Sequence, residues 1–204
     1  MPRLVIATHN IGKVREFAAL LGTARSLAHL HLVSLNELSP SPIMPNETGV
    51  TFAENARIKA LAIARECGLA TLADDSGLCV DALSGRPGIE SARWAGPDAT
   101  DLDRNIKLLN ELAGVPEELR TARFVCAIAL AEPSGNVVVR EGIWEGIITM
   151  TLRGGGGFGY DPLFFLPDFG LTAAEITSEI KNTVSHRARA LAQLIPDLAA
   201  LSLN

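Results

Sequence analysis

The amino-acid sequence predicts an α/β protein in which helices and strands form mixed layers. It opens with a short apolar run, "LVIA", that gives way to a helical repeat. A longer helix further along carries both a start and a stop signal. Near the middle, two or three β-rich runs surround a Pro-Ser-Gly-Asn turn. These three observations favour strands and helices that share one core.

The composition is that of an ordinary globular protein. Of 204 residues, 48% are hydrophobic and 20% are charged, which is enough apolar sequence for a well-buried core. The net charge of -5 argues against a surface that grips the nucleic-acid backbone. Three separated cysteines favour neither a disulfide framework nor a zinc site, and no apolar run suits a signal peptide or a membrane span. We therefore expect a cytoplasmic protein with no nucleic-acid or membrane partner.

The first elements follow from hydrophobic periodicity and capping signals. The segment "LVIATHNIGKVREFAALL" predicts a strand, a polar turn and a helix. In "TFAENARIKALAIAREC", Thr51 and Glu54 have capping-box spacing and Gly68 stands just past the last turn, so we expect a helix over 52–67. The stretches "TLADD" and "LCVDAL" predict two short strands about an acidic turn.

The later elements are predicted in the same way. "TDLDRNIKLLNELAG" indicates a helix with Thr100 as N-cap and Gly114 as C-cap. "ARFVCAIALAEPSGNVVVREGIWEGIIT" is the clearest hairpin, and its strands should pair antiparallel. A glycine-rich loop, a short helix from Thr172 and a final helix beginning near Ser185 complete the chain.

The acidic turn "DDSG" raises a chemical question, because Asp74 and Asp75 stand among apolar residues. Ionised carboxylates are costly to desolvate unless a cation or hydrogen-bond donors meet them. One interpretation is that either aspartate caps backbone N–H groups in a turn. The other is a metal site, since Glu47 in a Pro/Gly-rich loop could join an aspartate in binding Mg²⁺, which shares its shell with substrate phosphates.

Two further stretches could bind an anionic ligand. In "THNIGK", Thr8, Asn10 and Lys13 stand where a strand meets a helix N-terminus, a place that favours phosphate. Taken alone, Thr8 and Asn10 are better explained as simple helix caps. "IKNTVSHRARAL" places cations at a helix start, against the dipole, which suggests a compensating anion.

The stretch "RGGGGFGYDP" formally contains a GxGxxG pattern. We reject a dinucleotide-binding fingerprint, because Asp161-Pro162 follows at once instead of a long helix. The remaining interpretations are a flexible loop with Phe158 and Tyr160 in the core, or a close-approach loop whose aromatic ring stacks on a base.

At this point the sequence resembles the inosine triphosphate pyrophosphatase family. The resemblance runs nearly end to end and is carried by "ATHNIGKVREF", "ETGVTFAENARIKA", "LADDSGLCVDAL" with "GRPGIESARWAG", and "GGFGYDPLFF" followed by "KNTVSHRARAL", in the family's order and spacing. It implies a long central mixed β-sheet flanked by helices, with two lobes around an active-site cleft. It also implies one domain over 1–204, a homodimer, and hydrolysis of non-standard purine nucleoside triphosphates (ITP, dITP, XTP, dXTP) to the monophosphate and pyrophosphate.

The resemblance also implies roles for single residues. Glu47 and Asp75 would bind Mg²⁺, and Asp75 would accept the proton of the attacking water. The residues implied in substrate binding are Thr8, Asn10, Lys13, Ser76, Phe158, Gly159, Tyr160, Asp161, Lys181, His186 and Arg187.

The chain departs from the family's pattern at Asn46, where relatives often carry an acid, and at Gly155 and Trp94. Two alternatives stay open. One is a purine nucleotide-binding regulator that does not hydrolyse its ligand, and the other is a pyrophosphatase for modified pyrimidine nucleotides.

Overall fold

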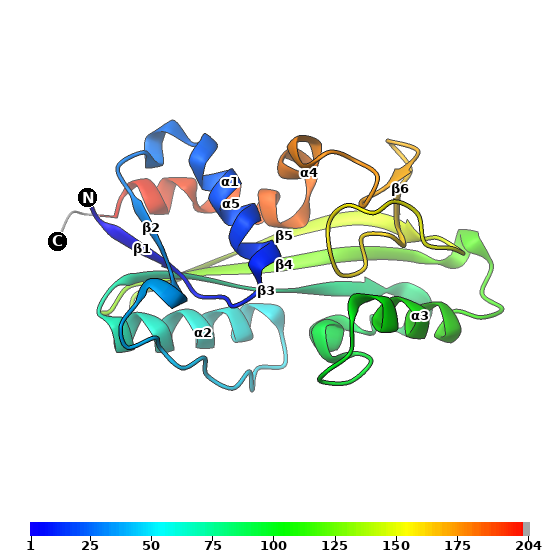
Figure 1. Ribbon diagram of the computed structural model, residues 1–204, viewed down its shortest axis with the longest axis horizontal. Helices are drawn as coiled ribbons and strands as arrows, with labels where there is room; N and C mark the ends of the chain where they lie inside the picture. Colours follow the sequence, from blue (N-terminus) through cyan, green and yellow to red (C-terminus); the bar gives the residue numbers. More distant parts are fainter. Residues whose placement is uncertain (202–204) are drawn as a thin grey trace. The chain divides into compact units, whose positions relative to one another are not determined.

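The computed structural model describes residues 1–201 and has a mixed β-sheet of seven strands, with the order β2-β1-β3-β4-β5-β6-β7 (Figure 1). The strands are β1 (Arg3–Ile6), β2 (His31–Ser34), β3 (Ala70–Val80), β4 (Thr121–Ala131), β5 (Val137–Ile148), β6 (Phe164–Leu166) and β7 (Leu171–Thr172). The helices are α1 (Ile11–Thr23), α2 (Phe52–Cys67), α3 (Asp101–Glu111), α4 (Ser178–Val184) and α5 (His186–Ala199). The predicted α/β class is confirmed.

The chain divides into two compact units, in line with the two lobes expected from the sequence. Unit 1 comprises 1–75, 126–142 and 187 onward, and unit 2 comprises 76–125 and 143–186. The long strands β3, β4 and β5 each contribute residues to both units. None of the helices formed by residues 1–201 combines the length and the apolar character that a membrane span requires.

Unit 1 begins with the predicted strand, turn and helix. β1 pairs in parallel with β2 on one side and with β3 on the other. α1 starts where Asn10 accepts a hydrogen bond from the backbone of Lys13, and it buries Phe17 and Leu21. β2 was not predicted, because its four residues form a half-buried run without alternation.

Helix α2 confirms the capping prediction in full. The Thr51 hydroxyl accepts from the Glu54 amide, while the Glu54 carboxylate accepts from the Thr51 amide. Gly68 ends the helix in the left-handed conformation with φ of 67°. In Figure 1, α2 covers one face of the unit 1 strands and α1 with α5 covers the other. Each face has its own apolar core, around Ile63 and around Phe17 respectively.

The prediction of two short strands about an acidic turn was wrong. Residues 70–80 form one continuous strand, β3, and the "DDSG" stretch lies inside it. The predicted β4–β5 hairpin is present, closed by the Glu132 amide donating to Asn136 O at 2.9 Å. A connection this short joins antiparallel neighbours.

Unit 2 has its own core, which contains Phe124, Trp144 and Phe164. Thr100 caps α3 as predicted, but the helix ends at the C-cap Leu112 and not at Gly114. The helix expected from Thr172 was also wrong: Thr172 lies in β7, and α4 begins after the N-cap Thr177.

Candidate active site

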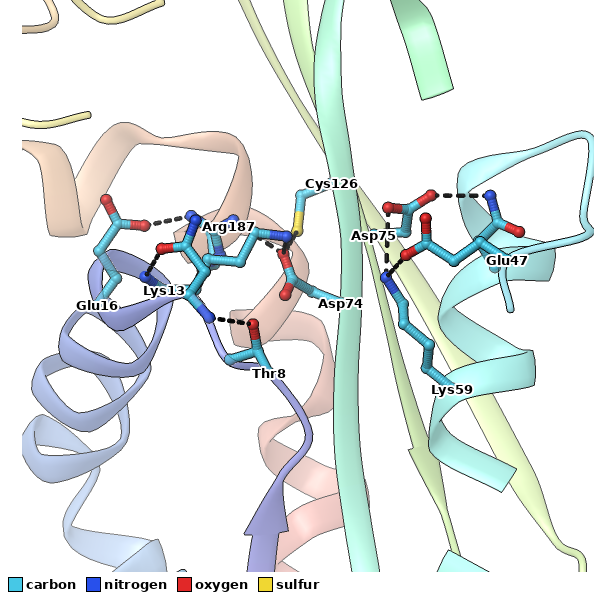
Figure 2. A network of polar contacts seen from close by, with 11 residues as sticks. Thr8, Lys13, Glu16, Glu47, Lys59, Asp74, Asp75, Cys126 and Arg187 are labelled. Carbon is cyan, nitrogen blue, oxygen red and sulfur yellow. Dashed lines mark hydrogen bonds and ion pairs between the residues drawn. The ribbon is translucent and has the colours of Figure 1, made fainter. Parts of the chain in front are cut away.

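The adjacent aspartates of β3 point to opposite faces of the strand (Figure 2). Successive side chains alternate across a strand, so a pair of neighbours cannot share one pocket. Asp74 faces Lys13, Arg187 and Cys126, whereas Asp75 faces Lys59 and Glu47. All of these residues belong to unit 1. The two carboxylates therefore have separate surroundings and are suited to separate tasks.

Asp74 is buried in a network of cations. Its Oδ2 lies 2.9 Å from Lys13 Nζ and 2.8 Å from an Arg187 guanidinium nitrogen. Burial alone would raise the pKa of the Asp74 carboxyl, but the charges of Lys13 and Arg187 outweigh it and hold that pKa far below its usual range. Asp74 is thus a permanent anion that ties α1 and α5 to β3.

Arg187 supplies the other half of this network from the start of α5. Its side chain is buried, and it pairs with Glu16 of α1 as well as with Asp74. Burial disfavours the charged guanidinium, but Asp74 raises the pKa of Arg187 above its usual value. The anions that compensate a cation at this helix start are therefore side chains of the chain itself. That Arg187 contacts substrate stays a prediction.

Asp75 sits on the other face in a cluster supplied by α2 and by the loop that precedes it (Figure 2). Lys59 Nζ lies 2.5 Å from Glu47 Oε1 and 3.4 Å from Asp75 Oδ1. Burial raises the pKa of the Asp75 carboxyl, and the Glu47 charge adds to that rise while Lys59 opposes it. Of the two aspartates, Asp75 is the one whose pKa is raised toward neutral pH, and such a rise suits a general base.

Asn55 and Lys59 were missed by the sequence reasoning. Asn55 donates from Nδ2 to Asp75 Oδ2 at 3.2 Å and accepts from the Gly49 amide at 2.8 Å, which links the loop of Glu47 to the strand. The signal was present: the two residues are four apart, on the stripe of α2 that also buries Ala56 and Ala60. Polar groups on a buried helix face mark a place where they have partners.

The strand-to-helix turn adopts the capping arrangement. Thr8 Oγ1 accepts from the Asn10 amide at 3.2 Å, and Asn10 Oδ1 accepts from the Lys13 amide at 3.1 Å. The Lys13 ammonium reaches Asp74. The capping interpretation is therefore confirmed for Asn10, whereas Thr8 bonds to the amide of this cap residue. A phosphate-binding role for these three residues stays a prediction, compatible with a helix start at this point.

Unit 2 gathers the residues predicted from the glycine-rich loop. Asp161 Oδ2 accepts from the Phe158 amide at 2.9 Å and from Lys181 Nζ at 2.6 Å. The Lys181 ammonium lies 4.9 Å from the centre of the Phe158 ring, a cation–π contact. No long helix follows this loop, since β6 comes next, so the rejection of a dinucleotide fingerprint is confirmed.

The other unit 2 residues are mostly buried. Tyr160 donates its hydroxyl to Ser91 O at 2.9 Å, and burial raises the pKa of that phenol. The His186 ring stacks on Phe124 with centroids 4.8 Å apart. Ser76 is half-buried and directly follows Asp75 along β3. The structure therefore forms one cluster about Asp74, one about Asp75 and one about Asp161, and the roles of their members in binding stay predictions.

The fold and these clusters define an α/β protein in which carboxylates and cations are paired on both faces of one sheet strand. The chain belongs to the Ham1 family, because the model of that family matches residues 4–197. This confirms that the resemblance read from the sequence covers nearly the whole chain.

Comparisons with individual proteins agree. The chain is 52% identical over 196 residues to a protein named dITP/XTP pyrophosphatase from Geobacillus kaustophilus, covering 95% of this chain and 93% of that protein. It is 49% identical to one of the same name from Desulforamulus reducens, over 99% and 98% of the two chains. Among solved structures it is similar to a HAM1 protein from Coxiella burnetii, with a TM-score of 0.86 at 42% identity over 97% of this chain and 98% of that one.

Proposed function

We propose that this protein hydrolyses non-standard purine nucleoside triphosphates such as dITP and XTP to the monophosphate and pyrophosphate. Membership of the Ham1 family and relatives named dITP/XTP pyrophosphatase at about half identity over nearly the full length support the substrate class. The observation that carries the chemistry is the cluster in which Asp75 and Glu47 share one cation, Lys59. The whole chain, 1–204, would act as one catalytic domain.

The residues around Asp75 fit a magnesium ion. Glu47 and Asp75 already converge on a positive charge, and two carboxylates plus substrate phosphates are a usual ligand set for Mg²⁺. Among residues 1–201 there is no cluster of three or more His, Cys, Asp or Glu side chains that could enclose a metal by themselves. We infer that Glu47 and Asp75 hold Mg²⁺ together with the substrate. When bound, the ion would supply positive charge against the developing charge of the phosphates.

Asp75 is the residue we assign to proton transfer. Its carboxylate would take a proton from a water molecule that attacks the α-phosphorus, while the bond from that phosphorus to the bridging oxygen breaks and pyrophosphate leaves. The raised pKa of Asp75 makes it a better proton acceptor than an ordinary aspartate. Asp74 cannot share this role, because its cations hold it as a weak base.

We assign the remaining residues to substrate binding. Thr8, Asn10 and Lys13 would hold phosphates at the start of α1, where the helix N-terminus and a lysine favour an anion. Ser76 would contact substrate beside Asp75. In unit 2 the substrate contacts would come from Phe158, Gly159, Tyr160, Asp161, Lys181 and His186, and Arg187 would contribute from the start of α5. We further infer from the resemblance that the protein forms a homodimer, which light scattering in solution would test. The cytoplasmic location expected from the sequence is kept as part of this proposal.

The function is tested by identifying products. The purified protein is incubated with ITP or XTP and Mg²⁺, and the expected products are IMP or XMP with pyrophosphate. A regulator that only binds nucleotide would leave the triphosphate intact. Inosine diphosphate with orthophosphate would contradict the assigned bond. Faster hydrolysis of modified pyrimidine triphosphates would favour the alternative of a pyrophosphatase for modified pyrimidine nucleotides.

Removal of the metal should nearly abolish turnover. With EDTA in place of Mg²⁺, we expect hydrolysis of ITP to fall to the background rate, because the polyphosphate would face two carboxylates without the charge of the metal ion. Restoring excess Mg²⁺ should restore the rate. Full activity in EDTA would contradict the assignment of Glu47 and Asp75 as metal ligands.

The variants Lys13→Ala and Lys181→Ala should each raise KM for ITP. A hydrogen bond to a charged group contributes about 1.5–3 kcal/mol, so each loss should raise KM by roughly tenfold or more. Arg15→Ala is the matched control, because Arg15 is an exposed cation on α1. Steady-state kinetics should show little change for the control. An unchanged KM in both lysine variants would contradict their assignment to substrate binding.

A further inference from the structure

Two side chains one turn apart on α3 hold both backbone groups of Gly159. Asp101 Oδ2 accepts from the Gly159 amide at 2.7 Å, and Asn105 Nδ2 donates to Gly159 O at 2.7 Å. Residues four apart lie on the same face of a helix, so the two side chains reach the loop together. We call Asp101 and Asn105 the α3 clamp. Neither residue was among the predicted site residues.

Asn105 is built into the helix for this contact. It is 2% exposed, and its Nδ2 also donates to Asp101 O at 2.7 Å, so both amide hydrogens are used. Two carbonyl acceptors fix which way the amide points. Its Oδ1 is buried and has no hydrogen-bond partner within residues 1–201. Burying an unpaired acceptor is unfavourable, and an apolar side chain would avoid that cost. We therefore relate the presence of an asparagine at this buried position to its hydrogen bond with the loop.

The clamp acts on a turn whose shape depends on Gly159. This glycine has φ of 64°, in the left-handed region, and the Asp161 amide closes the turn on Phe158 O at 3.3 Å. Inside the turn, Asp161 accepts from the Phe158 amide, and Lys181 covers one approach to the Phe158 ring. Since Asp101 and Asn105 bind the amide and the carbonyl of Gly159, these two side chains orient the turn.

We propose that Asp101 and Asn105 are positioning residues that hold the turn 158–161 so that the half-buried Phe158 ring meets the purine base of the substrate. The inference rests on the proposed function, and it names α3 as the element that sets base affinity. An aromatic ring stacked on a base rewards correct placement and reads no single edge group. Loosening the clamp should weaken binding of the nucleoside portion and leave the recognition of the triphosphate chain unchanged.

The test compares two changes at the exposed position Asp101 with one at Asn105. Asp101→Ala removes the acceptor for the Gly159 amide, whereas Asp101→Asn keeps an acceptor oxygen there. We expect KM for ITP to rise about fivefold or more in Asp101→Ala and in Asn105→Ala, with kcat changed less than about twofold. Asp101→Asn should stay close to the parent. Asn110→Ala, an exposed asparagine on the same helix, is the matched control.

Two further measurements separate positioning from general damage. Inhibition by inorganic tripolyphosphate should be equal in the parent and all variants, because it has no base to place. Hydrogen exchange at the Gly159 amide, measured by NMR, should accelerate in Asp101→Ala and not in Asp101→Asn. The exchange measurement needs no turnover, so an inactive parent would refute the proposed function while the clamp itself is still tested.

Three results would overturn the inference. The first is a KM in Asp101→Ala no higher than in the Asn110→Ala control. The second is a fall in kcat with unchanged KM, which would place the effect on catalysis. The third is a loss of tripolyphosphate inhibition as large as the loss of ITP binding in the same variant, which would mean that the whole substrate site is disturbed.

Discussion

Replacing Arg187 with alanine should lower the free energy of unfolding by about 3–5 kcal/mol, the usual cost of removing one partner from a buried ion pair. The substitution takes away the guanidinium that lies 2.8 Å from the fully buried Asp74 carboxylate and also contacts Glu16. Lys13 would then remain as the cation 2.9 Å from Asp74 Oδ2. Urea denaturation of the parent and the variant measures the difference.

The matched control for this change is Arg189→Ala, because Arg189 is an exposed arginine on the same helix. Surface substitutions usually alter stability by about 0.5 kcal/mol or less. Equal stabilities for the Arg187 and Arg189 variants would contradict the assigned role of the buried network.

The same network predicts how the loss of stability in Arg187→Ala depends on pH. In the parent, the pKa of Asp74 is lower in the folded than in the unfolded chain, where an aspartate titrates near about 3.9. Its stabilisation is therefore present above that value and is lost as pH falls toward the folded pKa. In Arg187→Ala the Asp74 pKa rises, so protonation relieves the buried charge earlier. The stability difference between parent and variant should narrow below about pH 4.

Local signals predicted the elements that depend on local chemistry. The capping box at Thr51 and Glu54, and the left-handed Gly68, set the bounds of α2 with no help from the rest of the fold. The hairpin between β4 and β5 follows likewise from its turn residues. By contrast, β2 has four residues and its pairing with β1 is settled by partners distant in sequence.

The acidic stretch of β3 shows why part of the site could not be predicted. "DDSG" has the composition of a turn, and its local sequence preference is for a turn. It is overridden because Lys13, Lys59 and Arg187 meet the two carboxylates from three helices, and these contacts span 16 to 113 residues of sequence. Once the segment is a strand, alternation alone sends Asp74 and Asp75 to different faces. Two residues that are neighbours in the sequence therefore belong to two separate clusters.

Replacing Asp75 with asparagine should leave the fold intact and lower kcat for ITP by about 10²-fold or more, the usual contribution of a general base. Asparagine keeps the shape of the side chain but cannot take a proton from water. Little stability should be lost, because burial and the Glu47 charge already disfavour the ionised form of Asp75. Lys59 would keep Glu47 as its ion-pair partner.

Asp74→Asn is the control that separates the two faces of β3. It removes a carboxylate that contacts both Lys13 and Arg187, so its main effect should be a loss of stability measured by urea denaturation. At a temperature where both variants remain folded, Asp74→Asn should retain more turnover than Asp75→Asn, since Asp74 is held too weakly basic to accept a proton. Equal losses of kcat in two fully folded variants would mean that the proton acceptor has been assigned to the wrong carboxylate, because only a difference between the faces distinguishes the base from the anion that holds α1 and α5 in place.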